Sequence, residues 1–133
     1  MSGIRPSRRA VIALFGVALL AWGCRENLME PLPAVREVNL TAWQWGYEPA
    51  RITVRKGTIL RLRARSLDVE HTLTNRALGI DLVIPARKEG EEKGPEAGPI
   101  EIPATVPGTY AFTCHASCGP ARSRQIFKLV VTN

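Results

Sequence analysis

The stretch that decides the fold reads Pro107-Gly108-Thr109-Tyr110-Ala111-Phe112-Thr113-Cys114-His115-Ala116-Ser117-Cys118-Gly119-Pro120. A Pro-Gly turn opens it, and a short predicted strand follows over residues 109–113. The Gly119-Pro120 pair excludes regular structure directly after the cysteines, so both thiols lie on a constrained loop at a strand end. Thiolates beside an imidazole select copper(I), zinc or an iron–sulfur cluster over hard cations. From the spacing alone, a disulfide between Cys114 and Cys118 is an equally good interpretation.

The overall composition indicates one globular domain of modest size. The chain has 133 residues, and 45% of them are hydrophobic, which is ordinary for a folded protein. Its formal net charge is +6, but Arg5, Arg8 and Arg9 lie near the amino terminus, and +3 remains without them. No basic residues interleave with aromatic ones in the manner that stacks bases. We therefore expect no nucleic-acid partner.

The amino terminus is typical of an export signal. Its arginines precede an apolar run of thirteen residues, 10–22, which suits a signal-peptide core and is short of the ~20 residues that span a bilayer. Gly23 and Cys24 follow, and the whole segment resembles a bacterial lipoprotein signal. We predict a signal peptide over residues 1–23 and lipidation of the Cys24 thiol; ordinary secretion and an uncleaved anchor are the alternatives. All three place the domain outside the cytoplasm, and the lipid anchor would hold it on the periplasmic face of the membrane.

The remainder of the chain has the periodicity of strands. Residues 24–36 contain prolines and no periodic pattern, which predicts a tether. From residue 37 onward, apolar and polar side chains alternate in short segments, most clearly where Leu60, Leu62 and Ala64 alternate with arginines. No window of a dozen residues shows helical periodicity. About seven short strands separated by Gly and Pro turns predict a β-sandwich or a small barrel over residues 37–133.

Two charged features accompany these strands. Arg61, Arg63 and Arg65 form a stripe that we interpret as the solvated face of a strand; contact with anionic lipid or with an acidic partner is the alternative. Residues 87–99 combine seven charged residues with glycines and prolines. That composition predicts an exposed loop from which nothing is buried.

Three separated motifs occur in a fixed order along the chain. They are Trp43-Gln44-Trp45-Gly46-Tyr47, then Ser66-Leu67-Asp68-Val69-Glu70-His71, then the Pro-Gly-x-Tyr strand that runs into Cys114-x-x-x-Cys118-Gly119. Together they resemble the cupredoxin domain of cytochrome c oxidase subunit II, which holds the binuclear copper centre CuA. The resemblance covers about Val38 to Val131. It implies an all-β, cupredoxin-like fold, namely an antiparallel Greek-key β-sandwich over residues 37–133.

The resemblance also implies a set of metal ligands. Cys114 and Cys118 would be the bridging thiolates, and His71 would be one terminal imidazole. The backbone carbonyl of Ala116 would be a weak axial ligand. In the family an aromatic side chain borders the copper, and the Trp-Gln-Trp motif offers two tryptophans for that place, of which one is expected at the surface.

Two positions depart from the pattern of the family. Arg122 stands where the second histidine is expected, and Gln125 stands where the methionine is expected. A guanidinium carries a fixed charge and has no lone pair to donate, so a binuclear centre lacks one strong ligand. We therefore expect one copper ion, held by His71 and the two cysteines Cys114 and Cys118. His115 is a candidate fourth ligand; the alternative is that position 115 tolerates many residues.

The functional prediction combines these observations. We expect an extracytoplasmic, membrane-tethered copper-binding cupredoxin that resembles oxidase subunit II and serves electron transfer to a redox protein or a respiratory oxidase subunit. One alternative is a metal-free structural subunit, as in quinol oxidases, and another is a periplasmic copper chaperone. The chain is not expected to be a catalyst by itself, because its cysteine and histidine lack a third catalytic member and no paired carboxylates occur.

Overall fold

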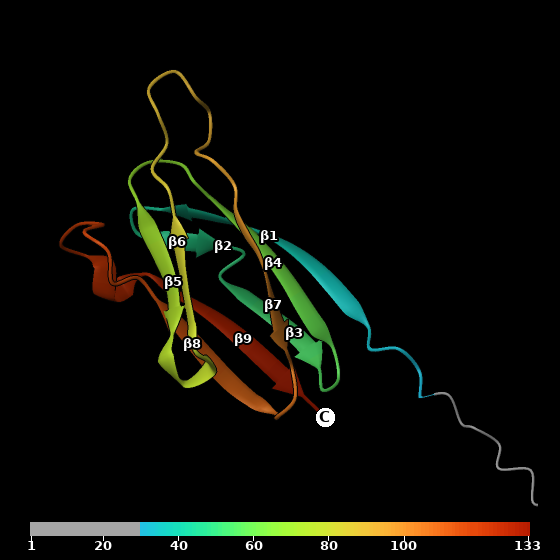
Figure 1. Ribbon diagram of the computed structural model, residues 1–133. Helices are drawn as coiled ribbons and strands as arrows, with labels where there is room; N and C mark the ends of the chain where they lie inside the picture. Colours follow the sequence, from blue (N-terminus) through green and yellow to red (C-terminus); the bar gives the residue numbers. More distant parts are fainter. Residues whose placement is uncertain (1–29) are drawn as a thin grey trace, which may run out of the picture. The chain divides into compact units, whose positions relative to one another are not determined.

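Nine strands and two 3₁₀ turns make up the part of the chain that the computed structural model describes, residues 30–133 (Figure 1). The strands are β1 (Val35–Trp43), β2 (Gly46–Glu48), β3 (Arg51–Arg55), β4 (Ile59–Ser66), β5 (His71–Asn75), β6 (Ile80–Ile84), β7 (Ala97–Pro103), β8 (Gly108–Thr113) and β9 (Ile126–Thr132), and the turns are η1 (Arg76–Leu78) and η2 (Arg122–Arg124). The predicted signal peptide and the lipidation of Cys24 lie outside the described residues. Within residues 30–133, no helix has the length and hydropathy to cross a membrane.

The strands form two sheets that pack face to face. One sheet has the order β2-β1-β4-β7, and the other has the order β3-β9-β8-β5-β6. The predicted all-β sandwich is confirmed. The sheets differ from a purely antiparallel arrangement, because β1 pairs with β4 in parallel and β3 pairs with β9 in parallel. After β2 the chain crosses to the second sheet as β3, so its return as β4 runs in the direction of β1. Side-chain alternation reports which face is buried but not the direction of a pairing.

Strand β4 shows how the alternating pattern builds the core. Leu60, Leu62 and Ala64 are buried between the sheets, and they pack with the paired aromatic rings of Phe112 and Phe127, whose centroids are 5.5 Å apart. Such side chains supply most of the stabilising apolar burial of a small domain. The core therefore holds the two sheets together and leaves one end of the sandwich free for loops.

The arginines of β4 point to the opposite face, where glutamates neutralise them. Arg61 is 2.8 Å from Glu37 on β1 and 2.9 Å from Glu101 on β7, and Arg63 is 2.6 Å from Glu37. Arg65 and Arg63 also approach Glu96. Three arginines facing three glutamates leave this stripe without net charge. The interpretation as a solvated strand face is thus supported over attraction of anionic lipid.

Two details differ from the sequence-based expectations. Strand β5 was not predicted, because His71, Thr72 and Leu73 are all buried and a strand covered on both faces shows no alternation.

In the charged segment 87–99, most residues are exposed as predicted, but Gly94 and Ala97 are buried. The Gly94 N–H donates to the carbonyl of Ser66, which ties this segment to the end of β4. The prediction that nothing in the segment is buried was therefore wrong.

Candidate metal centre

Three segments bring the predicted ligands together at one end of the sandwich. His71 is the first residue of β5, Cys114 follows the last residue of β8, and Cys118 lies in the loop between β8 and η2. Strands β5 and β8 are neighbours in their sheet, with Thr74 opposite Thr113. This register places the loop that follows β8 alongside the start of β5.

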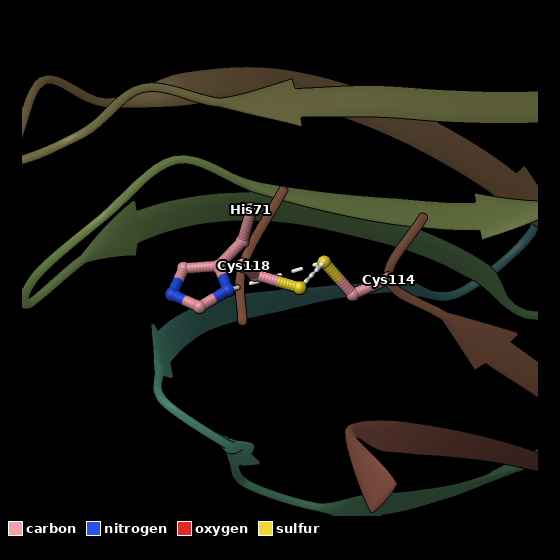
Figure 2. Close-up of side chains that lie close together, drawn as sticks. All are labelled: His71, Cys114 and Cys118. Carbon is pink, nitrogen blue, oxygen red and sulfur yellow. Dashed lines mark hydrogen bonds between the residues drawn. The ribbon is translucent and has the colours of Figure 1, made fainter. Parts of the chain in front are cut away.

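The donor atoms of the three residues converge in a buried site, which Figure 2 shows in close-up. His71 and Cys118 have no exposed surface, and Cys114 is 6% exposed. The Sγ atoms of the two cysteines are 2.6 Å apart, and Cys114 Sγ is 4.0 Å from His71 Nδ1. All three donor atoms lie within 4.8 Å of one another, and both cysteines are free. Two thiols and an imidazole are the donor types that a soft metal ion prefers, so this cluster is a possible metal site.

Asp68 fixes the orientation of the imidazole. Its Oδ1 accepts a hydrogen bond from Nε2–H of His71 at 2.7 Å, which directs Nδ1 toward the sulfur atoms. Hydrogen bonds within residues 66–69 stabilise the turn that carries Asp68. The Asp68 N–H donates to Ser66 Oγ, and the Val69 N–H donates to Asp68 Oδ1. A carboxylate that holds the second ring nitrogen is the usual partner of a metal-binding histidine.

Hydrogen bonds also keep Asp68 in its charged form. Partial burial acts to raise the pKa of its carboxyl group. The hydrogen bonds from His71 and from the backbone N–H groups of Gln44 and Val69 outweigh this effect, so the pKa of Asp68 lies below its ordinary value. The side chain is therefore a dependable acceptor for His71 at neutral pH.

The β1–β2 turn supports the cysteine loop from outside. Trp45 Nε1–H donates to the carbonyl of Cys118 at 2.7 Å, and Gln44 Nε2–H donates to the same oxygen at 3.0 Å. Trp45 packs against Gly119, where a Cβ atom would meet the indole ring at 3.0 Å, and the φ of +106° at Gly119 also favours glycine. Trp45 is 38% exposed, so an indole ring connects the cysteine loop with the surface.

The Cys118 thiol is neutral in the metal-free site. Burial, followed by the hydrogen bond with Cys114 and the charge of that group, raises the pKa of Cys118 to about 11. The cation of Arg122 acts in the opposite direction and is the smallest of these influences. A metal ion would therefore displace the thiol proton on binding, as thiolate ligands require.

His115 is the one predicted ligand that the structure does not bring to the other three. Its Nε2 lies 2.8 Å from Asp81 Oδ1, and its side chain is 55% exposed. The backbone N–H of His115 donates to Thr72 Oγ1, which holds the loop against β5.

Sequence reasoning missed two residues that contact the site. Gln125 is completely buried against His71, although the sequence marked it only as the replacement of a methionine. Asp68 contacts the imidazole from three positions earlier in the chain. The signal for Asp68 was the Ser-x-Asp-Val-x-His spacing, because an aspartate in such a turn can reach both the backbone and the histidine. Arg122 is exposed on η2 and does not enter the site.

The fold and the site together define a cupredoxin-like domain with a His-Cys-Cys cluster that could hold a metal. No protein-family profile matches the chain, and no curated protein matches it in sequence. Solved structures, however, match most of it, and they show similarity to subunit II of cytochrome oxidase and to other cupredoxins. At identities below 20% these matches establish the fold, and the sequence-based resemblance is confirmed at that level.

Three of the similar structures illustrate the range. A heme-copper terminal oxidase dimer contains a chain that matches with a TM-score of 0.64 and 19% identity, over 75% of this chain and 65% of the oxidase chain. The periplasmic domain of cytochrome oxidase subunit II (CoxB) of Bradyrhizobium japonicum matches with a TM-score of 0.58 and 15% identity, over 73% and 83% of the two chains. The blue copper protein auracyanin A of Chloroflexus aurantiacus matches with a TM-score of 0.52 and 13% identity, over 74% and 100%.

Proposed function

We propose that this chain is an extracytoplasmic, membrane-tethered cupredoxin that binds one copper ion and serves electron transfer, in the manner of an oxidase subunit II domain. The observation that carries the proposal is the convergence of His71 Nδ1 with the Sγ atoms of Cys114 and Cys118 in a buried site. The bound copper would supply a one-electron couple. The protein would hold it away from water, with Asp68 orienting the imidazole and the β1–β2 turn supporting the loop.

Metal analysis and an absorption spectrum of the purified full chain test this proposal directly. The chain is reduced, stripped of metal and then titrated with copper(I). One copper per chain is expected, and its loss on chelation should restore two titratable thiols in the domain. Two coppers with a purple, mixed-valence spectrum would contradict the mononuclear site. Before reduction, purified protein with no copper and joined thiols would favour the disulfide. Reduced protein whose free thiols bind no copper would favour a metal-free structural subunit.

A second candidate function is the transfer of copper(I) to another protein. It is favoured by the donor set, because two thiolates and one imidazole prefer copper(I), and no second imidazole joins the cluster among the described residues. The two functions differ in redox behaviour. An electron-transfer site cycles between copper(II) and copper(I) without losing the metal, and a delivery site releases copper(I) to a stronger thiol acceptor and does not hold copper(II).

The proposed partner is a respiratory oxidase subunit or a redox protein on the periplasmic face. Similar structures include an oxidase subunit II in a mixed disulfide with the thioredoxin-like protein TlpA, with a TM-score of 0.55 and 14% identity. That complex makes a thioredoxin-like protein a further partner to test for Cys114 and Cys118. The exposed edge of Trp45 beside the loop is the surface through which we propose that electrons pass.

Replacing Cys24 with serine should release the protein from membranes, because the lipid anchor would have no thiol to attach to. Copper content of the released protein should stay unchanged, since the proposed ligands lie in the folded domain. Membrane fractionation and metal analysis of the same preparations check both results. Membrane association of the serine variant that resists salt and alkali would indicate an uncleaved hydrophobic helix instead.

Replacing Asp68 with alanine should weaken copper(I) binding by about 10- to 100-fold, because the imidazole loses the carboxylate that orients it. Glu70→Ala is the matched control: it removes a carboxylate of equal charge from an exposed position one residue before His71. Competition with a chromophoric copper(I) chelator measures both affinities. Equal losses in the two variants would show that general charge, and not the contact with His71, governs the affinity.

A further inference from the structure

We infer that Gln125 is a fourth ligand of the metal, through the oxygen of its side-chain amide. The inference rests on the proposed metal site and adds to it a residue that sequence comparison would count as a lost ligand. Gln125 directly precedes β9, and its side chain has no exposed surface. A buried amide must have partners for both its oxygen and its nitrogen, and the identity of these partners determines which end faces the site.

The orientation of the amide follows from its two neighbours. On one side lies the backbone carbonyl of Gly46, which can only accept, so Gln125 Nε2–H donates to it at 3.1 Å. The amide oxygen must therefore face the other neighbour, Nδ1 of His71, and the two atoms are 3.1 Å apart. Nδ1 is also the ring nitrogen nearer to the cysteines, at 4.0 Å from Cys114 Sγ. The amide oxygen thus lies beside the imidazole nitrogen that is nearer to the cysteines.

The metal-free site leaves this oxygen facing another acceptor. Nε2–H of His71 already donates to Asp68, so the neutral imidazole turns the lone pair of Nδ1, and no hydrogen, toward Gln125 Oε1. Two buried acceptors that face each other at 3.1 Å are unfavourable. Coordination of one metal by both atoms would satisfy both. The spacing allows it, because donors about 2.0–2.2 Å from one tetrahedral metal lie roughly 3.4 Å from each other.

Gln125 is better placed for this role than the two alternatives on the same loop. His115 is hydrogen-bonded to Asp81 at the surface. Arg122 is exposed and has no lone pair that it could donate to a metal. Amide oxygen is also a known weak axial ligand of mononuclear copper sites that contain histidine and cysteine. The ligand set is therefore two thiolates, one imidazole and one amide oxygen, all buried.

Cobalt(II) titration of the reduced, metal-free full chain tests the inference, because the visible d–d bands of cobalt report the number and type of its ligands. The native chain should show the bands of a four-coordinate ion. Gln125→Leu, which has similar volume and no donor, should lower the affinity by about tenfold or more and change the bands. Gln125→Glu retains an oxygen and should keep the bands of the native chain. Asn39→Ala is the control: it removes an exposed side-chain amide on β1, outside the metal site. It should change the affinity by less than about threefold and leave the bands as they are.

The outcomes separate this inference from the proposed function. Failure of the native chain to bind cobalt(II) or copper(I) would overturn both. Binding by the native chain with unchanged bands in Gln125→Leu would overturn the inference alone, even if the affinity falls, since a supporting role alters affinity without changing the ligands. If circular dichroism shows that Gln125→Leu is unfolded, Gln125→Met decides: a thioether in place of the oxygen should change the bands, and native bands in this variant would contradict coordination by residue 125.

Discussion

Replacing Cys118 with serine is expected to lower the copper(I) affinity of the chain by about 100- to 1000-fold. A structural zinc site binds its metal with an apparent free energy of about 10–16 kcal/mol, and by analogy each of four ligands accounts for about 2.5–4 kcal/mol. Serine has nearly the same shape, but its hydroxyl group stays protonated at neutral pH and is a poor ligand for a soft ion. The side chain is completely buried, so no water-exposed donor can replace it easily. Chelator competition under reducing conditions measures the change.

The control for this prediction is Ser117→Ala. Ser117 is exposed on the same loop, directly before Cys118, and it is not one of the three residues of the cluster. Its replacement should leave the affinity within about a factor of three, as is usual for exposed substitutions. If Cys118→Ser binds copper(I) as tightly as the native chain, the cluster of His71, Cys114 and Cys118 is not the copper site.

The paired substitution of Arg122→His and Gln125→Met is expected to raise the copper content from one to two ions per chain and to produce the purple, mixed-valence spectrum of a binuclear centre. The two changes restore the imidazole and the thioether that the family resemblance implies. They also remove a cation whose charge opposes a second metal ion. Arg122 is exposed on η2, so the new imidazole has room to turn toward the cysteines, and position 125 already faces His71.

The matched control moves the new imidazole by two residues. Arg124→His combined with Gln125→Met has the same composition and charge, and it places the imidazole at the other end of the same 3₁₀ turn. It should bind one copper and stay without the purple spectrum. A purple species in the control would mean that any imidazole near the loop suffices. A single copper in the Arg122→His variant would mean that η2 cannot bring residue 122 to the cysteines.

Local patterns in the chain were sufficient for most of the fold. Strand β4 was predicted because one of its faces is apolar and the other carries arginines, and this period-two pattern reports burial directly. Strand β5 carries no such pattern, since His71, Thr72 and Leu73 are all buried. The parallel pairing of β1 with β4 was also beyond the sequence, because the direction of a pairing depends on how the chain crosses between the sheets.

The candidate metal ligands also divide into those that the sequence predicted and those that only the structure placed at the site. The spacing of Cys114 and Cys118 indicated a soft-metal site, the family resemblance added His71, and the structure brings these three residues together. The sequence suggested His115 as a fourth ligand and marked Gln125 only as the replacement of a methionine. Only the tertiary structure decides between them: it directs one toward Asp81 at the surface and buries the other against the imidazole.

Residue types and short spacings alone predicted the class of fold and the two thiols at a strand end. These properties depend on residue identity and on short spacings, which local geometry translates directly into structure. The tertiary structure decided which residues share the site, because donors separated by 43 to 54 positions in the chain meet only through the packing of β5, β8 and β9. It also decided that the charges of the β4 arginines are balanced, because neighbouring strands place glutamates beside them.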